Sequence, residues 1–229
     1  MLAQIRIGTL DISTYWIMLI CGILGMLLCT YSRRNIFQLK LWQCILFTLL
    51  LTLVGVAGAM LLYFLECGSF GGVSFFGSVY LIPLLMPLIG LLFRLKPGQT
   101  MDICGPCVAI MIGCMRFNCF LSGCCGGWQV CLGNFCFNWP TQAMDSIGDF
   151  LILLWLLQLE KRQTHSGKLY PLFMVSYSAM RFLLEFLRDT PKDWIYLSHG
   201  QWFAMAAIFI GVIWILGLGK KCKPNGCAA

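Results

Sequence analysis

Residues 104–121, CGPCVAIMIGCMRFNCFL, decide the fold of this chain. The run is long and apolar enough for a transmembrane helix, which needs about 20 mostly apolar residues. Its only charge is Arg116, and a second arginine, Arg181, lies in the apolar stretch Leu169–Leu187. A charge at the bilayer centre costs about 2.5–3.5 kcal/mol even on lenient insertion scales. The two arginines are therefore candidate functional residues.

The composition places the whole chain in the membrane class. Of its 229 residues 59% are hydrophobic and 11% charged, and the mean hydropathy is +0.83. These values exclude an ordinary soluble domain. We predict an all-α, polytopic membrane protein with seven transmembrane helices over Ile12–Thr30, Leu41–Tyr63, Ser74–Phe93, Met101–Leu121, Thr141–Glu160, Leu169–Leu187 and His199–Leu218.

The basic residues predict the orientation, because cytoplasmic loops of membrane proteins carry an excess of Lys and Arg. With the N-terminus outside and the C-terminus inside, the outer side carries only Arg6, Arg188 and Lys192. The inner side then carries eleven: Arg33, Arg34, Lys40, Arg94, Lys96, Lys161, Arg162, Lys168, Lys220, Lys221 and Lys223. The net charge of +7 is thus explained by topology, and no nucleic-acid partner is expected.

The chain divides into three parts. Residues 1–11 are expected to form an amphipathic arm on the outer surface, residues 12–218 the transmembrane domain, and residues 219–229 a basic cytoplasmic tail. The first span is not expected to be a cleaved signal peptide, because its positive charges follow the apolar run.

The cysteines allow several interpretations. Cys104-Gly105-Pro106-Cys107 spells a thioredoxin-type tetrapeptide, but inside a membrane span it favours helix packing over redox chemistry. In the outer loop a disulfide, thiol chemistry and a metal site all remain open, although the spacing is not a standard zinc pattern. These loop cysteines are Cys124, Cys125, Cys131 and Cys136. We expect no metal and no organic cofactor.

The sixth predicted span carries the clearest polar pattern. Tyr177, Arg181, Glu185 and Arg188 are spaced by four, four and three residues, which places them on one helical face. A salt bridge that only braces helix packing is one interpretation. Such bracing, however, is achieved at lower cost by apolar residues.

Two glycine-rich segments accompany these charges. Arg116 is followed by the exit segment Phe117–Gly127, and the third predicted span opens with Gly71–Gly77. Glycines let backbone amides approach a ligand closely, and guanidinium groups match phosphate geometry. We therefore predict that Arg116 and Arg181 bind the phosphate of an anionic lipid near the outer leaflet.

The sequence resembles the bacterial prolipoprotein diacylglyceryl transferase family over most of its length. Arg116–Gly127 is similar to the family signature, and Arg181–Arg188 is similar to the end of its penultimate helix. Further similar segments are Ile7-Gly8-Thr9-Leu10, Tyr15-Trp16-Ile17-Met18, Gly71–Gly77, Asp102 with Pro106, Pro140-Thr141-Gln142 and Gly200-Gln201.

The resemblance implies a function in the bacterial cytoplasmic membrane. The family transfers a diacylglyceryl group from phosphatidylglycerol to the thiol of a lipobox cysteine in a preprotein. A thioether forms and glycerol phosphate leaves, at the outer face. The implied catalytic residues are Arg116, Arg181 and Glu185. The implied substrate-binding residues are Tyr15, Gly71, Gly72, Ser74, Cys119, Gly127, Arg188 and His199.

The chain departs from the family at several positions. Phe76 stands at the family's third-helix histidine, Cys119 at the signature asparagine, and Cys124 at an acidic residue of the exit loop. The outer loop between spans four and five is short. Alternative interpretations are a paralogue with the same donor and another acceptor, a membrane thiol oxidoreductase, and a non-enzymatic lipid-binding protein. Glu185 and His199 are the candidate proton acceptors, and a third alternative is that the thiol needs none beyond its own ionisation.

Overall fold

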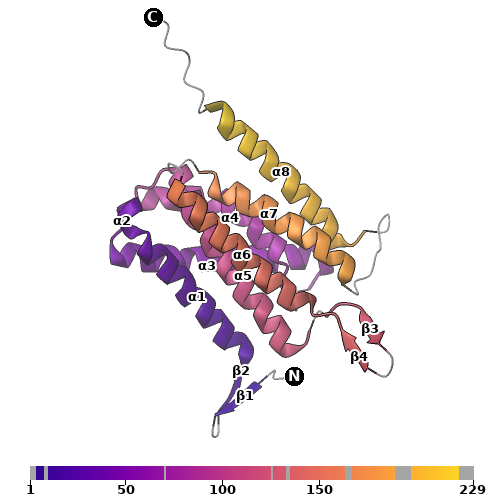
Figure 1. Ribbon diagram of the computed structural model, residues 1–229. Helices are drawn as coiled ribbons and strands as arrows, with labels where there is room; N and C mark the ends of the chain where they lie inside the picture. The colour runs from indigo at the N-terminus through magenta and orange to yellow at the C-terminus, as the bar shows by residue number, and fades with distance from the viewer. Residues whose placement is uncertain are drawn as a thin grey trace, which may run out of the picture.

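The computed structural model describes residues 4–7, 10–69, 71–124, 126–132, 135–162, 167–188 and 197–221. Long helices run up and down in a bundle (Figure 1). They are α1 Thr14–Ser32, α3 Leu41–Cys67, α4 Phe75–Leu92, α5 Pro97–Ser122, α6 Thr141–Arg162, α7 Leu169–Leu184 and α8 His199–Lys221. The shorter elements are helix α2 Arg34–Phe37, the 3-10 helix η1 Glu185–Leu187, and the strands β1 Gln4–Ile7, β2 Leu10–Ser13, β3 Gln129–Leu132 and β4 Phe135–Asn138.

The helices follow the predicted spans closely. The described residues contain six helices long and apolar enough to cross a membrane, namely α1, α3, α4, α5, α6 and α8. Helix α7 has 16 residues and continues into η1, so the predicted span Leu169–Leu187 tightens at Glu185. The structure thus contains an all-helical membrane domain with two added antiparallel hairpins, β1-β2 and β3-β4.

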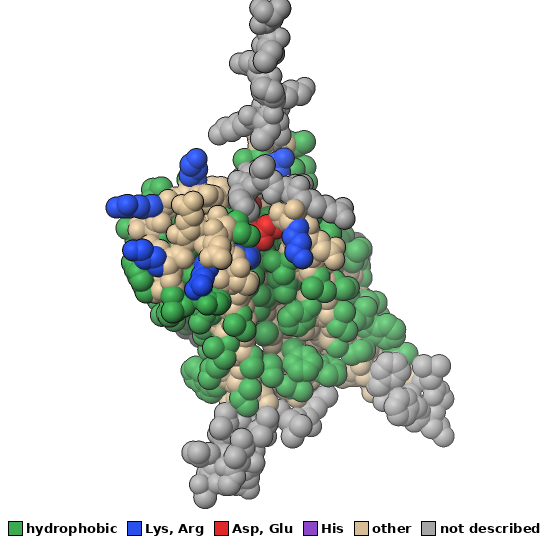
Figure 2. Space-filling model, turned by 60° about the vertical axis from the view of Figure 1, so that its left-hand side comes forward, with side chains coloured by type: hydrophobic (Ala, Val, Ile, Leu, Met, Phe, Trp, Pro, Cys, Tyr) green, Lys and Arg blue, Asp and Glu red, His purple; other side chains and the backbone are tan. Residues whose placement is uncertain are grey.

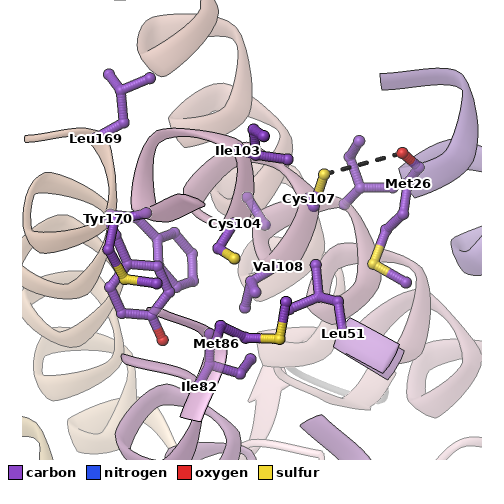
Figure 3. Packing of buried hydrophobic residues seen from close by; sticks show 14 of the residues in the cluster. Met26, Leu51, Ile82, Met86, Ile103, Cys104, Cys107, Val108, Leu169 and Tyr170 are labelled. Carbon is purple, nitrogen blue, oxygen red and sulfur yellow. Dashed lines mark hydrogen bonds between the residues drawn. The ribbon is translucent and has the colours of Figure 1, made fainter. Parts of the chain in front are cut away.

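Helix α5 forms the centre of the bundle and packs against α1, α4, α6 and α7. Its membrane-spanning window is 72% buried, whereas that of α1 is 22% buried. Cys104 and Cys107 are fully buried among Met86, Val108 and Tyr170 (Figure 3). These two cysteines are core residues of α5, as the packing interpretation predicts.

The flanks of the bundle are apolar and one end is basic. Large apolar side chains are exposed along the flanks, among them Leu53, Leu84 and Phe209. A soluble protein rarely exposes such continuous apolar surface, whereas a bilayer covers it. On the face seen in Figure 2, Lys and Arg side chains gather at the upper end. The exposed basic residues of this basic end are Lys40, Arg94, Lys96 and Lys161.

Prolines inside two helices leave carbonyl groups that other side chains satisfy. A proline has no N–H, so the carbonyl four residues earlier loses its helical partner. Pro83 in α4 frees the Val79 carbonyl, which accepts a hydrogen bond from the Tyr170 hydroxyl at 2.9 Å. Pro106 in α5 frees the Asp102 carbonyl in the same way, and this group accepts from Arg33 at 2.7 Å.

The Asp102 side chain anchors the connection between α6 and α7 at the basic end. Its carboxylate accepts hydrogen bonds from the backbone N–H groups of Gly167 at 2.9 Å and Leu169 at 3.0 Å. Arg33 also bonds Glu160 at 2.6 Å, so α1, α5 and α6 are joined there. Both hairpins lie at the opposite end of the bundle (Figure 1).

Candidate active site

A cavity of about 870 Å³ opens at the end of the bundle opposite the basic residues. It is bounded by the first residues of α1, α4 and α8 and by the last residues of α3, α5 and α7. The antiparallel order of the helices brings these ends together. Because neighbouring helices run in opposite directions, residues distant in the sequence share this one site.

Arg181 is the centre of the charge network beside the cavity. Its Nη1 atom lies 2.9 Å from Asp145 Oδ2, and its Nη2 atom lies 2.9 Å from Glu185 Oε2. Asp145 comes from α6, whereas Glu185 lies one turn further along the chain from Arg181. The guanidinium therefore uses two different nitrogens to join two carboxylates, and the side chain is only 6% exposed.

Arg116 lies on the other side of the same carboxylate. Its Nε atom is 3.6 Å from Asp145 Oδ2, and its guanidinium carbon lies 4.7 Å from the centre of the Phe75 ring. We call Arg116 and Arg181 the arginine pair. The Nε atoms of both arginines are buried and donate no hydrogen bond. Buried donors of this kind call for a partner.

Glu185 joins the arginine pair to the loop segments. Its Oε1 atom accepts a hydrogen bond from Ser198 at 3.1 Å, and its Oε2 atom lies 3.6 Å from Arg188 Nη1. Three arginines and two carboxylates are thus in direct contact. A further buried carboxyl group, that of Asp149, interacts electrostatically with Arg116 and Arg181.

Arg188 is held in place by the segment that follows α5. Gly127 forms an antiparallel β-bridge with Arg188, and the indole N–H of Trp128 donates to the Arg188 carbonyl at 2.7 Å. A Cβ atom at Gly127 would collide with the Leu187 carbonyl oxygen. Glycine is therefore required for this close approach of two backbones.

The structure brings ten of the eleven predicted site residues together around the cavity. They are Tyr15, Gly71, Gly72, Ser74, Arg116, Cys119, Arg181, Glu185, Arg188 and His199. Gly127 does not line the cavity and contacts Arg188 instead. Close packing explains Gly72, where a Cβ atom would lie 2.6 Å from the Tyr63 ring. Their individual roles remain predictions.

Sequence reasoning missed several residues of the site. Asp145, 1% exposed, bridges the arginine pair, yet in the sequence it only weakened the apolar character of the fifth span. Glu66, Asn118 and Ser198 also line the cavity. A usable signal existed for Asp145, because two arginines buried in a membrane require a nearby counter-charge.

Phe76 occupies an aromatic cluster at the base of α4. Its ring centre lies 5.7 Å from that of Tyr177 and 6.2 Å from that of Phe203, and the side chain is 5% exposed. A phenyl ring accepts no proton. The position at which the resembling family has a histidine therefore contributes packing alone in this chain.

A small apolar pocket continues from the cavity between α1, α3, α4 and α5. Tyr15, Val73, Phe75 and Met115 line both spaces, so the two are contiguous. The pocket extends to Met26 on α1. A cavity that holds charged side chains and is joined to an apolar pocket matches the two-part character of a phospholipid.

The outer-loop cysteines differ in their surroundings. Cys131 is disulfide-bonded and lies opposite Cys136 in the β3-β4 hairpin. Cys124 lines the cavity, and its thiol lies 3.7 Å from the Cys119 carbonyl oxygen. Cys125 lies outside the described residues. Among the side chains that the structure describes, no group of three or more His, Cys, Asp or Glu has a metal-binding arrangement.

Comparisons with known proteins identify relatives of this chain. A relative named phosphatidylglycerol–prolipoprotein diacylglyceryl transferase in Clostridium tetani is 33% identical over 127 residues, which cover 50% of this chain and 51% of that protein. A second protein of that name in Clostridium perfringens is 27% identical over 198 residues, covering 76% and 77%. The chain thus matches about half the length of the first relative. The family profile named prolipoprotein diacylglyceryl transferase matches residues 3–217, and the chain belongs to this family.

Proposed function

We propose that the protein transfers a diacylglyceryl group from phosphatidylglycerol to the thiol of a lipobox cysteine in a preprotein. The sulfur forms a bond to the glycerol carbon, the bond from that carbon to the phosphate oxygen breaks, and glycerol phosphate leaves. The observation that carries the proposal is the arginine pair, buried in a membrane domain beside one shared carboxylate. Family membership and the names of the relatives support the same reaction.

The arginine pair is suited to the phosphate of the donor lipid. Its Nε atoms are buried donors without a hydrogen-bond partner, and phosphate oxygens are strong acceptors. Negative charge develops on the leaving phosphate in the transition state. Fixed guanidinium groups in a site of low dielectric stabilise such charge without having to reorganise. We therefore assign Arg116 and Arg181 to the donor phosphate and its departure.

The remaining site residues support this pair. Glu185 holds Arg181 and Arg188 in place through its Oε2 atom. The apolar pocket that begins at Tyr15 and Val73 is suited to the start of an acyl chain. Gly71, Gly72, Ser74 and Cys119 complete the wall of the cavity around the head group. No cofactor takes part in this reaction.

We infer a topology of seven transmembrane helices with the N-terminus outside. The sixth of these spans is α7 together with η1, which reaches Leu187. The basic end then faces the cytoplasm, as the distribution of Lys and Arg favours. The cavity faces the outer leaflet of the bacterial cytoplasmic membrane, where a secreted preprotein presents its cysteine.

The experiment uses the purified protein with labelled phosphatidylglycerol and a lipobox peptide. We expect formation of a thioether-linked peptide by the wild type, and loss of this product in Arg116→Ala and Arg181→Ala. Arg94→Ala is the matched control, because Arg94 is exposed at the basic end. Tight lipid binding without product on any thiol peptide would refute the transfer. Product on another thiol but not on the lipobox peptide would establish the same donor with a different acceptor.

A further inference from the structure

Transfer to a thiol near neutral pH is accelerated by a group that removes the thiol proton, because the thiolate is the nucleophile. Phe76 cannot serve. Among the described residues that line the cavity, the carboxylates and imidazole are those of Glu66, Glu185 and His199. These three are the candidates that the structure offers for accepting a proton.

Glu185 is committed to other contacts. Its Oε2 atom lies 2.9 Å from Arg181 and 3.6 Å from Arg188, and its Oε1 atom accepts from Ser198 at 3.1 Å. Both oxygens of this carboxylate are thus already engaged by Arg181, Arg188 and Ser198, so neither is free to receive the thiol proton. Glu185 is therefore a positioning residue, and Glu66 and His199 remain.

His199 is placed beside the arginine network by its neighbours in the chain. It is the first residue of α8, and it follows Ser198, whose hydroxyl bonds Glu185. Gly200 on its other side abuts the same carboxylate, because a Cβ atom there would lie 3.4 Å from Glu185 Oε1. The residues on both sides of His199 thus lie against Glu185, one of them hydrogen-bonded to it, and the His199 side chain is exposed to the cavity.

Glu66 lines the same cavity as His199. It lies at the last turn of α3, its carboxylate accepts a hydrogen bond from Ser74 just before α4, and it interacts electrostatically with His199. A carboxylate near an imidazole can orient the ring for proton transfer. An imidazole also exchanges protons more readily near neutral pH than a carboxylate does.

We infer that His199 is the catalytic base for the acceptor thiol and that Glu66 is its positioning residue. This inference rests on the proposed function. The thiol proton moves to the imidazole, the thiolate attacks the glycerol carbon, and the leaving phosphate departs toward the arginine pair. The imidazolium then returns its proton to water or to the released glycerol phosphate. The base of this chain thus comes from α8, whereas α4 supplies only Phe76.

The test measures thioether formation as a function of pH in His199→Gln and Glu66→Gln. The other charged side chains that line the cavity with His199 are those of Glu66, Arg116, Arg181, Glu185 and Arg188. The remaining titratable groups of the cavity lining are cysteine thiols and tyrosine phenols. We expect His199→Gln to lower kcat near neutral pH by about 100-fold, the lower range for general base catalysis. Its rate should recover only at alkaline pH, where the peptide thiol ionises unaided. Added imidazole should restore part of the rate.

Glu66→Gln should reduce kcat less than His199→Gln does, because the imidazole remains and only its neighbouring carboxylate is lost, and Glu66→Asp should retain more of the rate than Glu66→Gln. His165→Gln is the matched control, since His165 is the only other histidine in the chain. Binding of phosphatidylglycerol should be unchanged in all of these variants, which excludes misfolding. A wild-type rate and profile in His199→Gln would overturn the inference while leaving the transfer reaction established. Absence of product with the wild type would refute the proposed function instead.

Discussion

The carboxylate of Asp145 lies 2.9 Å from the Nη1 atom of Arg181. The same oxygen atom, Oδ2, lies 3.6 Å from the Nε atom of Arg116. One carboxylate therefore sets the separation of the two guanidinium groups to which we assign the donor phosphate. Removing it would leave two like charges facing each other in a membrane interior.

We expect Asp145→Asn to lower the transfer rate at least tenfold and to lower the free energy of unfolding by roughly 3 kcal/mol, the lower range for breaking a buried ion pair. Thermal unfolding in detergent and the peptide assay measure the two effects. Asp149→Asn, one turn further along α6, is the comparison variant, because Asp149 interacts electrostatically with both arginines but neither of its carboxylate oxygens has a hydrogen-bond partner. Equal losses in the two variants would contradict a specific role for Asp145.

Replacement of the two arginines by lysine should reduce activity by different amounts. Arg181 bridges Asp145 and Glu185 through separate nitrogens, and an ammonium group cannot reproduce this planar fork. Arg116 makes a single ion pair and a cation–π contact, which lysine can partly retain. We expect Arg181→Lys to be at least tenfold less active than Arg116→Lys. The ratio of kcat/KM values measures this difference, and a ratio of one would contradict the assigned geometry.

Gly127 should affect activity through Arg188 without contacting the lipid. Gly127→Ala forces a Cβ atom against the Leu187 carbonyl and disturbs the β-bridge to Arg188. We expect a severalfold loss of kcat/KM. Gly126→Ala is the control, because a Cβ atom at Gly126 would lie 3.6 Å from Gln142 Nε2, which is an ordinary van der Waals contact. If both variants lose activity equally, the loop acts in another way.

The inferred orientation is testable by cysteine labelling in intact cells. Cys67 is exposed at the cavity end of α3, whereas Cys222 follows α8 in the sequence. In single-cysteine variants, a membrane-impermeant maleimide should label Cys67 directly and Cys222 only after permeabilisation. The reverse order would place the cavity on the cytoplasmic side.

The sequence predicted the helices well because membrane spans have a simple signature. The start of α3 at Leu41 and the start of α8 at His199 coincide with their predicted positions. Helix α5 begins four residues before the predicted Met101, since Pro97 suits the first turn of a helix. The change from α-helix to 3-10 helix at Glu185 does not alter the pattern of apolar residues, so hydropathy alone could not predict it.

The site was predictable in part. Charges inside apolar runs identified Arg116, Arg181 and Glu185, because such charges are rare in membranes. Asp145 lies near the start of a less apolar helix, and a carboxylate at such a position is expected at the membrane–water interface. Glu66 likewise falls at the end of α3. Its approach to His199 depends on how α3 and α8 are placed, which one sequence does not specify.

Arg33 and Pro106 depend on each other across 73 positions of the chain. The proline removes the helical partner of the Asp102 carbonyl, and the arginine supplies a replacement donor at 2.7 Å. An ordinary residue at position 106 would restore an N–H that competes with Arg33 for this oxygen. A change at Arg33, conversely, would leave the carbonyl buried without a donor. Among homologous sequences the two positions should accordingly covary, each retained where the other is present.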